Sequence, residues 1–367
     1  MSRGWRFMDL GDLSPVSTQV IYHAVAESVD KGMSPNTIIF CRPNSPFVCL
    51  GYHQELDVEI DVEYCRLRGL PIVRRILGGG AVYLDNDQLF YQVVACKFDP
   101  DVPGTVQGAF RKYLEAPVKT YNDVGIPASY RPVNDIEVDG RKISGSGATE
   151  VGSSVILTGN MIFDFNFDEM ARILKVPSEK FRDKAAKTLR ERLTTMKKEL
   201  AEPPSKELVR QLLRRNYELT LNIELKDGML SSEELNRIRD LEKQYSSPDW
   251  LHLVENEHEE LVQRRNLKIT GRAFIGEVVH KTRGGILRVL VETLDNKISE
   301  IMITGDFSFI PKEHLKTLER ELQGTEVSEE TLTERILRVY EEYSIESPGL
   351  TAEDIAGAVA AAASGKN

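Results

Sequence analysis

The sequence predicts an α+β fold, in which a mixed sheet with flanking helices is followed by a second, smaller α/β domain. Two observations lead to this prediction. Short strand and helix patterns alternate irregularly over the first 250 residues, and strand patterns followed by helical ones return beyond residue 260. Pro and Ser in "YSSPDW" mark the boundary between the two parts. We therefore expect domains at 1–250 and 251–347, and a terminal helix or flexible tail at 348–367.

The elements of the first domain follow from hydrophobic spacing. Helical spacing at 15–31 predicts a helix, with Ser14 as its N-cap. The following runs predict strands at 36–42, 47–52 and 71–77, a helix at 57–68, one or two strands at 81–95 and a helix at 105–125. Asp139-Gly140 predicts a hairpin turn, and the alternation at 154–163 predicts a strand. Residues 167–243 show a charged helical pattern.

The second domain also shows strand and helix patterns, over fewer residues. "ILRVLVETL" and "KISEIMIT" predict strands, and residues 311–322 and 328–344 predict helices.

Composition excludes several classes of protein. The chain has 367 residues and a net charge of −10, which argues against general binding to nucleic acid or to anionic membranes. The N-terminus lacks a secretory signal, and no apolar run approaches the roughly 20 residues needed to span a bilayer. We expect a cytoplasmic protein. The six histidines are scattered, so we expect no structural zinc site.

The four cysteines, Cys41, Cys49, Cys65 and Cys96, lie in the first third of the chain without CxxC spacing. In a chain of this length they are expected to be reduced and mostly buried.

The stretch "RRILGGGAVY" at 74–83 is unusual within a strand-rich region, because consecutive glycines weaken a strand. Glycine lets a backbone approach a ligand closely, and successive N–H groups can form an anion-binding nest. The two arginines would add donors for a phosphate or carboxylate. The motif is neither a P-loop nor a dinucleotide fingerprint. Taken alone, the run is better explained by a tight turn or bulge with solvated arginines.

A second motif, "NDIEVDGRKISGSGA", places Lys142 in a strand before another glycine-rich segment. A lysine on an inward face of a strand needs an anionic partner, although most strand lysines are exposed. Together the two motifs indicate one phosphate-bearing ligand.

These paired motifs resemble the lipoate–protein ligase A family, within the biotin/lipoate ligase superfamily. "PFVCLGYHQ" and "ILKVPSEKFRDKAAKTLRERLTTM" add to the resemblance, which covers roughly residues 5–250. "HKTRGGILRVLVETLDNKISEIMITGDFSFIP" is similar to the accessory domain of these ligases, here fused to the catalytic domain. The resemblance implies a biotin/lipoate-ligase-like mixed sheet and a small α/β accessory domain associated with the activation step. The glycines of the accessory segment are equally explained as turns between strands.

The implied reaction has two steps. The lipoate carboxylate attacks the α-phosphate of ATP, giving lipoyl-adenylate and pyrophosphate. The amine of a specific lysine on a lipoyl-carrier protein then attacks the adenylate and releases AMP. The implied acceptor is the lipoyl domain of a 2-oxoacid dehydrogenase E2 subunit, a glycine-cleavage H protein or a specialised lipoate-binding protein.

The resemblance also implies roles for individual residues. Lys142 would stabilise charge on the phosphate and acyl oxygens as the catalytic residue. Arg75, supported by Arg74, would hold the phosphate, and the glycine backbone would lie against the acyl group. Asn134 and Asp135 would help to place Mg²⁺ or the adenosine. The residues expected to bind substrate or ATP are Arg74, Arg75, Gly78, Gly79, Gly80, Ala81, Asp85, Asn134, Asp135 and Gly145.

The chain departs from the family pattern at several positions. Leu77 stands where a Ser or Thr is usual, and Leu84 precedes Asp85 where the family has His. Asp87-Gln88 replaces Gly-Asn, and Thr158-Gly159-Asn160 matches His-Gly-Thr only at its glycine. These changes affect the expected adenine and acyl contacts, but they leave the arginines, the glycines and Lys142 in place.

Two other functions remain open. An octanoyl or lipoyl transferase of the same superfamily would use a cysteine thioester. No cysteine follows Cys96, which argues against that chemistry. A non-catalytic lipoate-binding protein would explain the departures, but it would have little use for both motifs. Biotin–protein ligase is disfavoured because its basic glycine-rich loop is missing. The basic run at 179–198 is a candidate docking surface for an acidic carrier, or else a solvated helix face.

Overall fold

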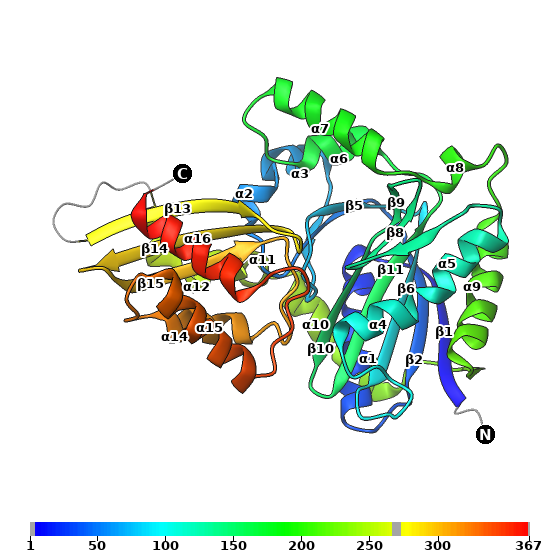
Figure 1. Ribbon diagram of the computed structural model, residues 1–367. Helices are drawn as coiled ribbons and strands as arrows, with labels where there is room; N and C mark the ends of the chain where they lie inside the picture. The colour runs from blue at the N-terminus through cyan, green and yellow to red at the C-terminus, as the bar shows by residue number, and fades with distance from the viewer. Residues whose placement is uncertain (1–3, 266–272, 366–367) are drawn as a thin grey trace. The chain divides into compact units, whose positions relative to one another are not determined.

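The computed structural model describes residues 4–265 and 273–365, which divide into two compact units (Figure 1). The larger unit holds the chain up to Cys49, together with Glu59–Arg74 and Val82–Ser247. The smaller unit holds Leu50–Val58, Arg75–Ala81 and the chain from Pro248 onward. Two short segments of the first hundred residues thus belong to the smaller unit, which no sequence pattern indicated.

A six-stranded mixed sheet forms the centre of the larger unit. Its order is β10 (Ser146–Val151), β11 (Ser154–Ile162), β6 (Gln88–Cys96), β2 (Thr37–Pro43), β1 (Gly4–Leu13) and β12 (Glu224–Asp227). β1 runs parallel to β2 and β12, whereas β2, β6, β11 and β10 pair antiparallel. The predicted mixed sheet is confirmed. The short edge strand β12 was not predicted, because "ELKD" has no clear apolar alternation.

Helices cover both faces of this sheet. Gln92 donates from its side-chain amide to the carbonyl of Thr18 in α1 (Pro15–Asp30), at 2.8 Å. The ring of the neighbouring Tyr91 packs against that of Tyr217 in α9 (Lys206–Leu221), with ring centroids 6.3 Å apart and the planes tilted by 59°. Because consecutive strand residues point to opposite faces, α1 and α9 lie on opposite sides of the sheet. β6 and β11 are therefore buried nearly throughout, although the alternation at 154–163 had indicated one apolar face.

The predicted cap of the first helix is confirmed, since the backbone N–H of Ser17 donates to the Ser14 hydroxyl at 3.1 Å. Two longer predicted helices are each divided. The helix expected at 57–68 is α2 (Leu56–Glu59) and α3 (Val62–Arg68), because Asp61 caps a new helix. The one expected at 105–125 is α4 (Val106–Tyr113) and α5 (Glu115–Asp123); Pro117, which has no N–H to donate, lies in the first turn of α5.

Two small sheets and several helices complete the larger unit. β4 (Ile72–Arg74), β3 (Phe47–Leu50) and β5 (Val82–Leu84) form one sheet, and β7 (Ser129–Arg131), β8 (Asp135–Val138) and β9 (Arg141–Ser144) form the other. Asp139 and Gly140 both have positive φ, so the predicted β8–β9 hairpin turn is confirmed. The remaining helices are α6 (Phe167–Ile173), α7 (Glu179–Arg192), α8 (Met196–Glu199) and α10 (Ser232–Tyr245).

The smaller unit is built on an antiparallel sheet of β13 (Ala273–Lys281), β14 (Ile286–Leu294) and β15 (Lys297–Gly305). Its helices are α11 (Pro248–Leu251), α12 (Leu253–Glu257), α13 (Glu259–Arg264), α14 (His314–Leu322), α15 (Glu329–Glu342) and α16 (Ala352–Ser364). α16 lies across β13 and β14 (Figure 1). The predicted strands at "ILRVLVETL" and "KISEIMIT" and the helices after them are confirmed.

The two faces of the small sheet are covered by different helices. Val289 and Val291 pack with α14, α15 and α16 in the main core, whereas Leu290 packs with Leu261 of α13. The alternation along β14 thus separates two apolar layers.

The contact between α1 and α10 should measurably stabilise the larger unit. Arg237 of α10 donates twice to Glu27 of α1, at 2.7 Å each. Burial opposes ionisation of Glu27, but His23 and Arg237 lower its pKa to about 2. Because the folded pKa is depressed, this contribution is present above about pH 4.5 and is lost as pH falls toward 2.

We predict that Arg237→Met lowers the free energy of unfolding by about 1 kcal/mol at pH 7, because Glu27 loses a partly exposed partner that donates to both of its carboxylate oxygens. Urea denaturation at pH 7 and pH 3 measures the effect, which should shrink at the lower pH. Arg239→Met, an exposed change on the same helix, should alter stability by less than about 0.5 kcal/mol. Equal losses in the two variants would contradict the assignment.

Candidate functional site

The predicted site residues divide between the two units. Arg74, Asp85, Asn134, Asp135, Lys142 and Gly145 belong to the larger unit, and Arg75, Gly78, Gly79, Gly80 and Ala81 belong to the smaller one. The chain passes from one unit to the other between Arg74 and Arg75. Arg74 is fully buried at the end of β4.

The β8–β9 hairpin brings four of the predicted residues together. Lys142 lies on β9, and its ammonium is 2.5 Å from a carboxylate oxygen of Asp135 at the start of β8. Both side chains are about one-third exposed, so the pair is accessible. Gly145 follows β9, and the ammonium lies close above it, 3.8 Å from where a Cβ would stand. The Asn134 amide donates to the carbonyl of Ser146 at 2.6 Å, which fixes the start of β8 against β10.

A chain of buried hydrogen bonds supports this turn from the central sheet. The backbone N–H of Gly145 donates to the side-chain oxygen of Asn160 at 2.9 Å. The Asn160 amide in turn donates to the side-chain oxygen of Gln88 at 2.7 Å. Gln88 is the first residue of β6 and Asn160 lies two residues before the end of β11, and these two strands pair antiparallel. Two of the departures from the family pattern, Gln88 and Asn160, are therefore hydrogen-bonded partners.

The segment Thr158-Gly159-Asn160 requires glycine at its centre because of the neighbouring Tyr91. A Cβ at this position would lie 2.3 Å from the ring of Tyr91, so only glycine admits that ring. The Tyr91 hydroxyl lies 3.1 Å from the hydroxyl of Ser144, which donates to the carbonyl of Asn160 at 2.6 Å. Tyr91 of the central sheet thus contacts β9, the strand that carries Lys142.

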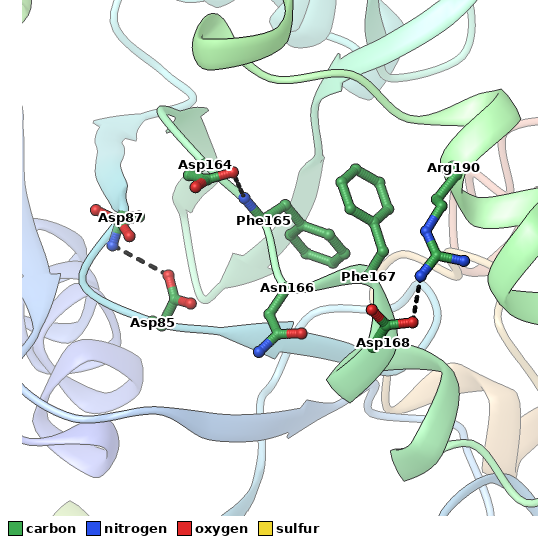
Figure 2. Close-up of a pocket in the computed structure, with 8 residues that line it drawn as sticks. All are labelled: Asp85, Asp87, Asp164, Phe165, Asn166, Phe167, Asp168 and Arg190. Carbon is green, nitrogen blue, oxygen red and sulfur yellow. Dashed lines mark hydrogen bonds and ion pairs between the residues drawn. The ribbon is translucent and has the colours of Figure 1, made fainter.

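Asp85 lines a pocket of about 370 Å³ (Figure 2). The other lining residues are Asp87, Asp164, Phe165, Asn166, Phe167, Asp168 and Arg190. Burial raises the pKa of Asp85, and a hydrogen bond from the backbone N–H of Asp87 partly offsets this. The N–H of Gln88 donates to the carbonyl of Asp85 at 3.3 Å, so the pocket joins the hydrogen-bond chain that ends at Gly145.

Cations already balance most of the acidic lining. Lys206 binds Asp87 at 2.7 Å, Lys197 binds Asp164 at 2.6 Å, and Arg190 of α7 pairs with Asp168. Figure 2 shows Arg190 and Asp168 facing each other at one side of the pocket. Among the residues that the structure describes, no group of three or more His, Cys, Asp or Glu is arranged to hold a metal ion.

In the smaller unit, the glycine loop lies against the chain that follows β15. A Cβ on Gly78 would lie 2.3 Å from the carbonyl oxygen of Phe307 and 2.9 Å from Cα of Ser308. The backbone N–H of Gly79 donates to the same carbonyl at 3.2 Å, and Gly79 has a φ of +89°. Close approach of a second backbone segment therefore requires glycine at position 78, a constraint that the sequence alone had not indicated.

Arg75 is engaged with its own loop. Its guanidinium donates to the carbonyls of Gly78 at 2.7 Å and Gly80 at 2.9 Å, and these bonds fix the curvature of the loop. The backbone N–H of Tyr52 donates to the carbonyl of Leu77 at 2.9 Å. Leu77 itself is buried, as is Leu84 in the larger unit, so both departures from the family pattern are core side chains.

A second pocket, of about 140 Å³, lies within the smaller unit. It contains the buried pair of His258 and Glu319, whose nearest atoms are 3.3 Å apart. Burial opposes the charge on His258, but the hydrogen bond and charge of Glu319 raise its pKa above the usual value. Burial also lowers the pKa of Lys312 in the same pocket.

Comparison with known proteins decides the family. Residues 18–218 match the family described as the lipoyl protein ligase A/B catalytic domain. The chain belongs to this family. Residues 273–358 match a second family, described as the bacterial lipoate protein ligase C-terminus. The resemblance seen in the motifs, and the fold that it implied, are both confirmed.

Relatives within the family have two different activities. The octanoyltransferase LipM of Moorella thermoacetica is 28% identical over 266 residues, which cover 67% of this chain and 97% of that protein. Lipoate-protein ligase A subunit 1 of Thermoplasma acidophilum is 31% identical over 214 residues, covering 55% of this chain and 79% of the relative. The comparisons therefore place the chain among ligases and transferases of this superfamily.

Two solved structures are similar to the chain. One is a bi-partite lipoate protein ligase with its E2 lipoyl domain from Thermoplasma acidophilum, with a TM-score of 0.62 and 29% identity. The match covers 69% of this chain and 98% of the ligase chain. The other is lipoate-protein ligase A bound with ATP, with a TM-score of 0.59, 25% identity, and coverage of 68% and 99%.

Sequence reasoning missed several residues around these sites. Gln88 and Asn160 were noted only as departures from a pattern, and their simultaneous change was the available signal. Phe307 and Ser308 gave no signal, because a backbone contact leaves no mark on residue type. None of the described helices combines the length and hydrophobicity needed to cross a membrane.

We predict that Gly78→Ala displaces the glycine loop from Phe307, at a cost of about 1–3 kcal/mol, because its Cβ has no room. Hydrogen exchange of the 75–81 peptide measures the change, since the N–H of Gly79 is protected by Phe307. Gly80→Ala is the matched control, because its Cβ would have 3.5 Å to the nearest atom, in Asp306. Unchanged exchange in Gly78→Ala would refute the packing argument.

A pH-dependent stability should follow from His258. Because its folded pKa is raised, the stabilising contribution is complete below about pH 6.5 and is lost as pH rises through the folded value. We expect His258→Ala to cost about 3 kcal/mol at pH 6 and less at pH 8.5, as measured by urea denaturation. His280→Ala, at a half-exposed position of the same unit, should show no such trend.

Proposed function

We propose that this protein is an ATP-dependent lipoate–protein ligase, which activates lipoate as lipoyl-AMP and transfers the lipoyl group to a lysine of a lipoyl-carrier protein. Transfer by a cysteine thioester is the alternative within the same family. The two mechanisms differ in what they require near the reacting acyl group. A transferase needs an accessible thiolate, whereas a ligase needs a cation and a place for ATP.

The placement of the thiols carries the proposal. Cys41, Cys49 and Cys65 are buried, and burial raises the pKa of Cys65 to about 11 and that of Cys41 well above its usual value. Cys96 ends β6, eight residues from Gln88 at the other end. At about 3.3 Å per residue, some 26 Å of strand separates Cys96 from the end that supports Lys142. All four thiols are thus poorly placed to accept an acyl group there.

The C-terminal match supports the same conclusion. The similarity to the octanoyltransferase uses 97% of that protein but only 67% of this chain. The family description that matches residues 273–358 is that of a lipoate protein ligase C-terminus. A chain with this additional region has the make-up expected of a ligase.

Lys142 and Asp135 form the proposed catalytic pair. When lipoate and ATP bind, the ammonium of Lys142 would turn from Asp135 to the α-phosphate and the acyl oxygen, where negative charge redistributes during attack. The lipoate carboxylate oxygen forms a bond to the α-phosphorus as the bond to pyrophosphate breaks. In the second step the acceptor amine forms an amide with the acyl carbon, and AMP leaves with the bonding electrons.

The Asp135 carboxylate also suits the Mg²⁺ that accompanies ATP, together with Asn134 beside it. Mg²⁺ binds nucleotides through one or two carboxylates and the phosphates, so it needs no larger protein cage. The geometry of Arg75 points to a role in shaping the glycine loop, whose backbone we propose lies along the bound acyl-adenylate. Asp85 would contact substrate from its pocket.

The test is the intact mass of an apo lipoyl domain from an E2 subunit after incubation with the protein, lipoate, Mg²⁺ and ATP. We expect a lipoyl-sized gain that requires ATP, and a loss of at least about 100-fold in rate for Lys142→Ala. Lys97→Ala is the matched control, since Lys97 is another partly exposed lysine paired with a carboxylate, Glu150, at 2.8 Å.

Cys96→Ser separates the two mechanisms. A ligase should retain full activity in this variant. Acyl transfer from an octanoyl carrier protein without ATP, abolished by Cys96→Ser, would instead establish the transferase.

A further inference from the structure

Helix α7 carries charge of the opposite sign to the protein as a whole. Glu179–Arg192 has six Lys or Arg and three Asp or Glu, a net charge of +3 in a chain whose total is −10. Such a local concentration of positive charge on an acidic protein creates a field that attracts an anionic partner.

The basic side chains of α7 are presented to solvent. The helix packs against α6 and β9, Ala186 is its one buried residue, and Arg182 and Leu189 are half-buried on the same face. Lys180, Lys184 and Lys187 are exposed and recur every three or four residues, so they form one stripe on the outer face. Phe181, with 54% of its surface exposed, lies beside this stripe as an apolar contact.

Little within the chain neutralises the stripe. Lys187 has a distant partner, Glu191, at 3.9 Å. Neither Lys180 nor Lys184 forms an ion pair with any residue in the described parts of the chain. These lysines make no contribution to packing, so they are free to contact another molecule.

The C-terminal end of α7 is fixed to the strand of Lys142. Leu193, which follows the helix, pairs with Lys142 as a parallel bridge, and the N–H of Thr194 donates to the Lys142 carbonyl at 2.8 Å. At 1.5 Å per residue, Lys187, Lys184 and Lys180 lie about 9, 14 and 20 Å along the axis from Leu193. A protein interface of about 800 Å² per partner is roughly 30 Å across, so one docked domain could cover both the stripe and this strand.

We propose that the outer face of α7, formed by Lys180, Phe181, Lys184 and Lys187, docks the acceptor domain through acidic side chains of that domain. This assignment depends on the proposed function, because it is the lysyl acceptor that must reach Lys142. Charge complementarity selects the partner: the stripe fits an acidic surface and repels a basic one. The fixed end of α7 then directs the acceptor lysine toward β9.

The experiment compares two double charge reversals on exposed helix faces of the same unit. Lys180→Glu/Lys184→Glu reverses the stripe, and Arg239→Glu/Lys243→Glu on α10 makes the same change in net charge elsewhere. The KM for an acidic apo lipoyl domain should rise about tenfold at low salt for the α7 variant and less than twofold for the α10 variant. The difference should diminish in 0.5 M NaCl. Lipoate-dependent pyrophosphate exchange, which needs no acceptor, should be the same in both.

Binding of the apo lipoyl domain by calorimetry, without ATP, separates docking from chemistry. If the domain binds through α7 but is never acylated, the proposed ligase activity fails and the docking surface stands. An unchanged KM, an equal rise in the α10 variant, or an equal fall in pyrophosphate exchange would overturn the docking surface. The proposal would also be overturned if the α7 reversal weakened binding of a single-stranded oligonucleotide as much as binding of the lipoyl domain. The helix would then attract any polyanion. If the Lys180→Glu/Lys184→Glu variant does not fold, Lys180→Gln/Lys184→Gln replaces it. Its expected rise in KM is about half as large on a logarithmic scale, because it removes the two charges without reversing them.

Discussion

The hydrogen bond between Gln88 and Asn160 is the constraint on which the Lys142 site depends. It joins the first residue of β6 to the end of β11 inside the sheet, where an unpaired amide would be costly. The free oxygen of Asn160 then holds the N–H of Gly145, so the turn after β9 has one position relative to the sheet. Tyr91 fills the space beneath, because Gly159 has no side chain. Lys142 is therefore positioned by the core of the unit.

Charge is distributed around that site in a consistent way. The ammonium of Lys142 is held by Asp135, the carboxylates of the neighbouring pocket are largely matched by Lys197, Lys206 and Arg190, and α7 has an excess of positive charge. Pairing inside the pocket limits the cost of burying acidic groups. The unpaired basic side chains face water, where a charge costs little and remains available for a partner.

Much of the fold could be predicted from the sequence, because amphipathic spacing and turn residues act locally. The Ser14 cap, the Asp139-Gly140 turn and the strands of both units were of this kind. The divided helices at 57–68 and 105–125 were not, because one capping Asp or one Pro outweighs the periodicity around it. For the site, the motifs located Lys142, Asp135 and Gly145, which the hairpin brings together. The Gln88–Asn160 pair and the contact of Gly78 with Phe307 join residues that are distant in sequence, so the departures from the family pattern and the glycine run marked the positions without naming their partners.

The contact of the glycine loop with Phe307 has a consequence for how the chain is organised. Gly78 and Phe307 are 229 residues apart in sequence, yet their backbones touch. In one continuous chain this contact is intramolecular, so it forms at an effective concentration that does not depend on how much protein is present. A relative made as a bi-partite ligase has no such guarantee from covalent linkage. Fusion makes the conformation of this loop independent of expression level and dilution.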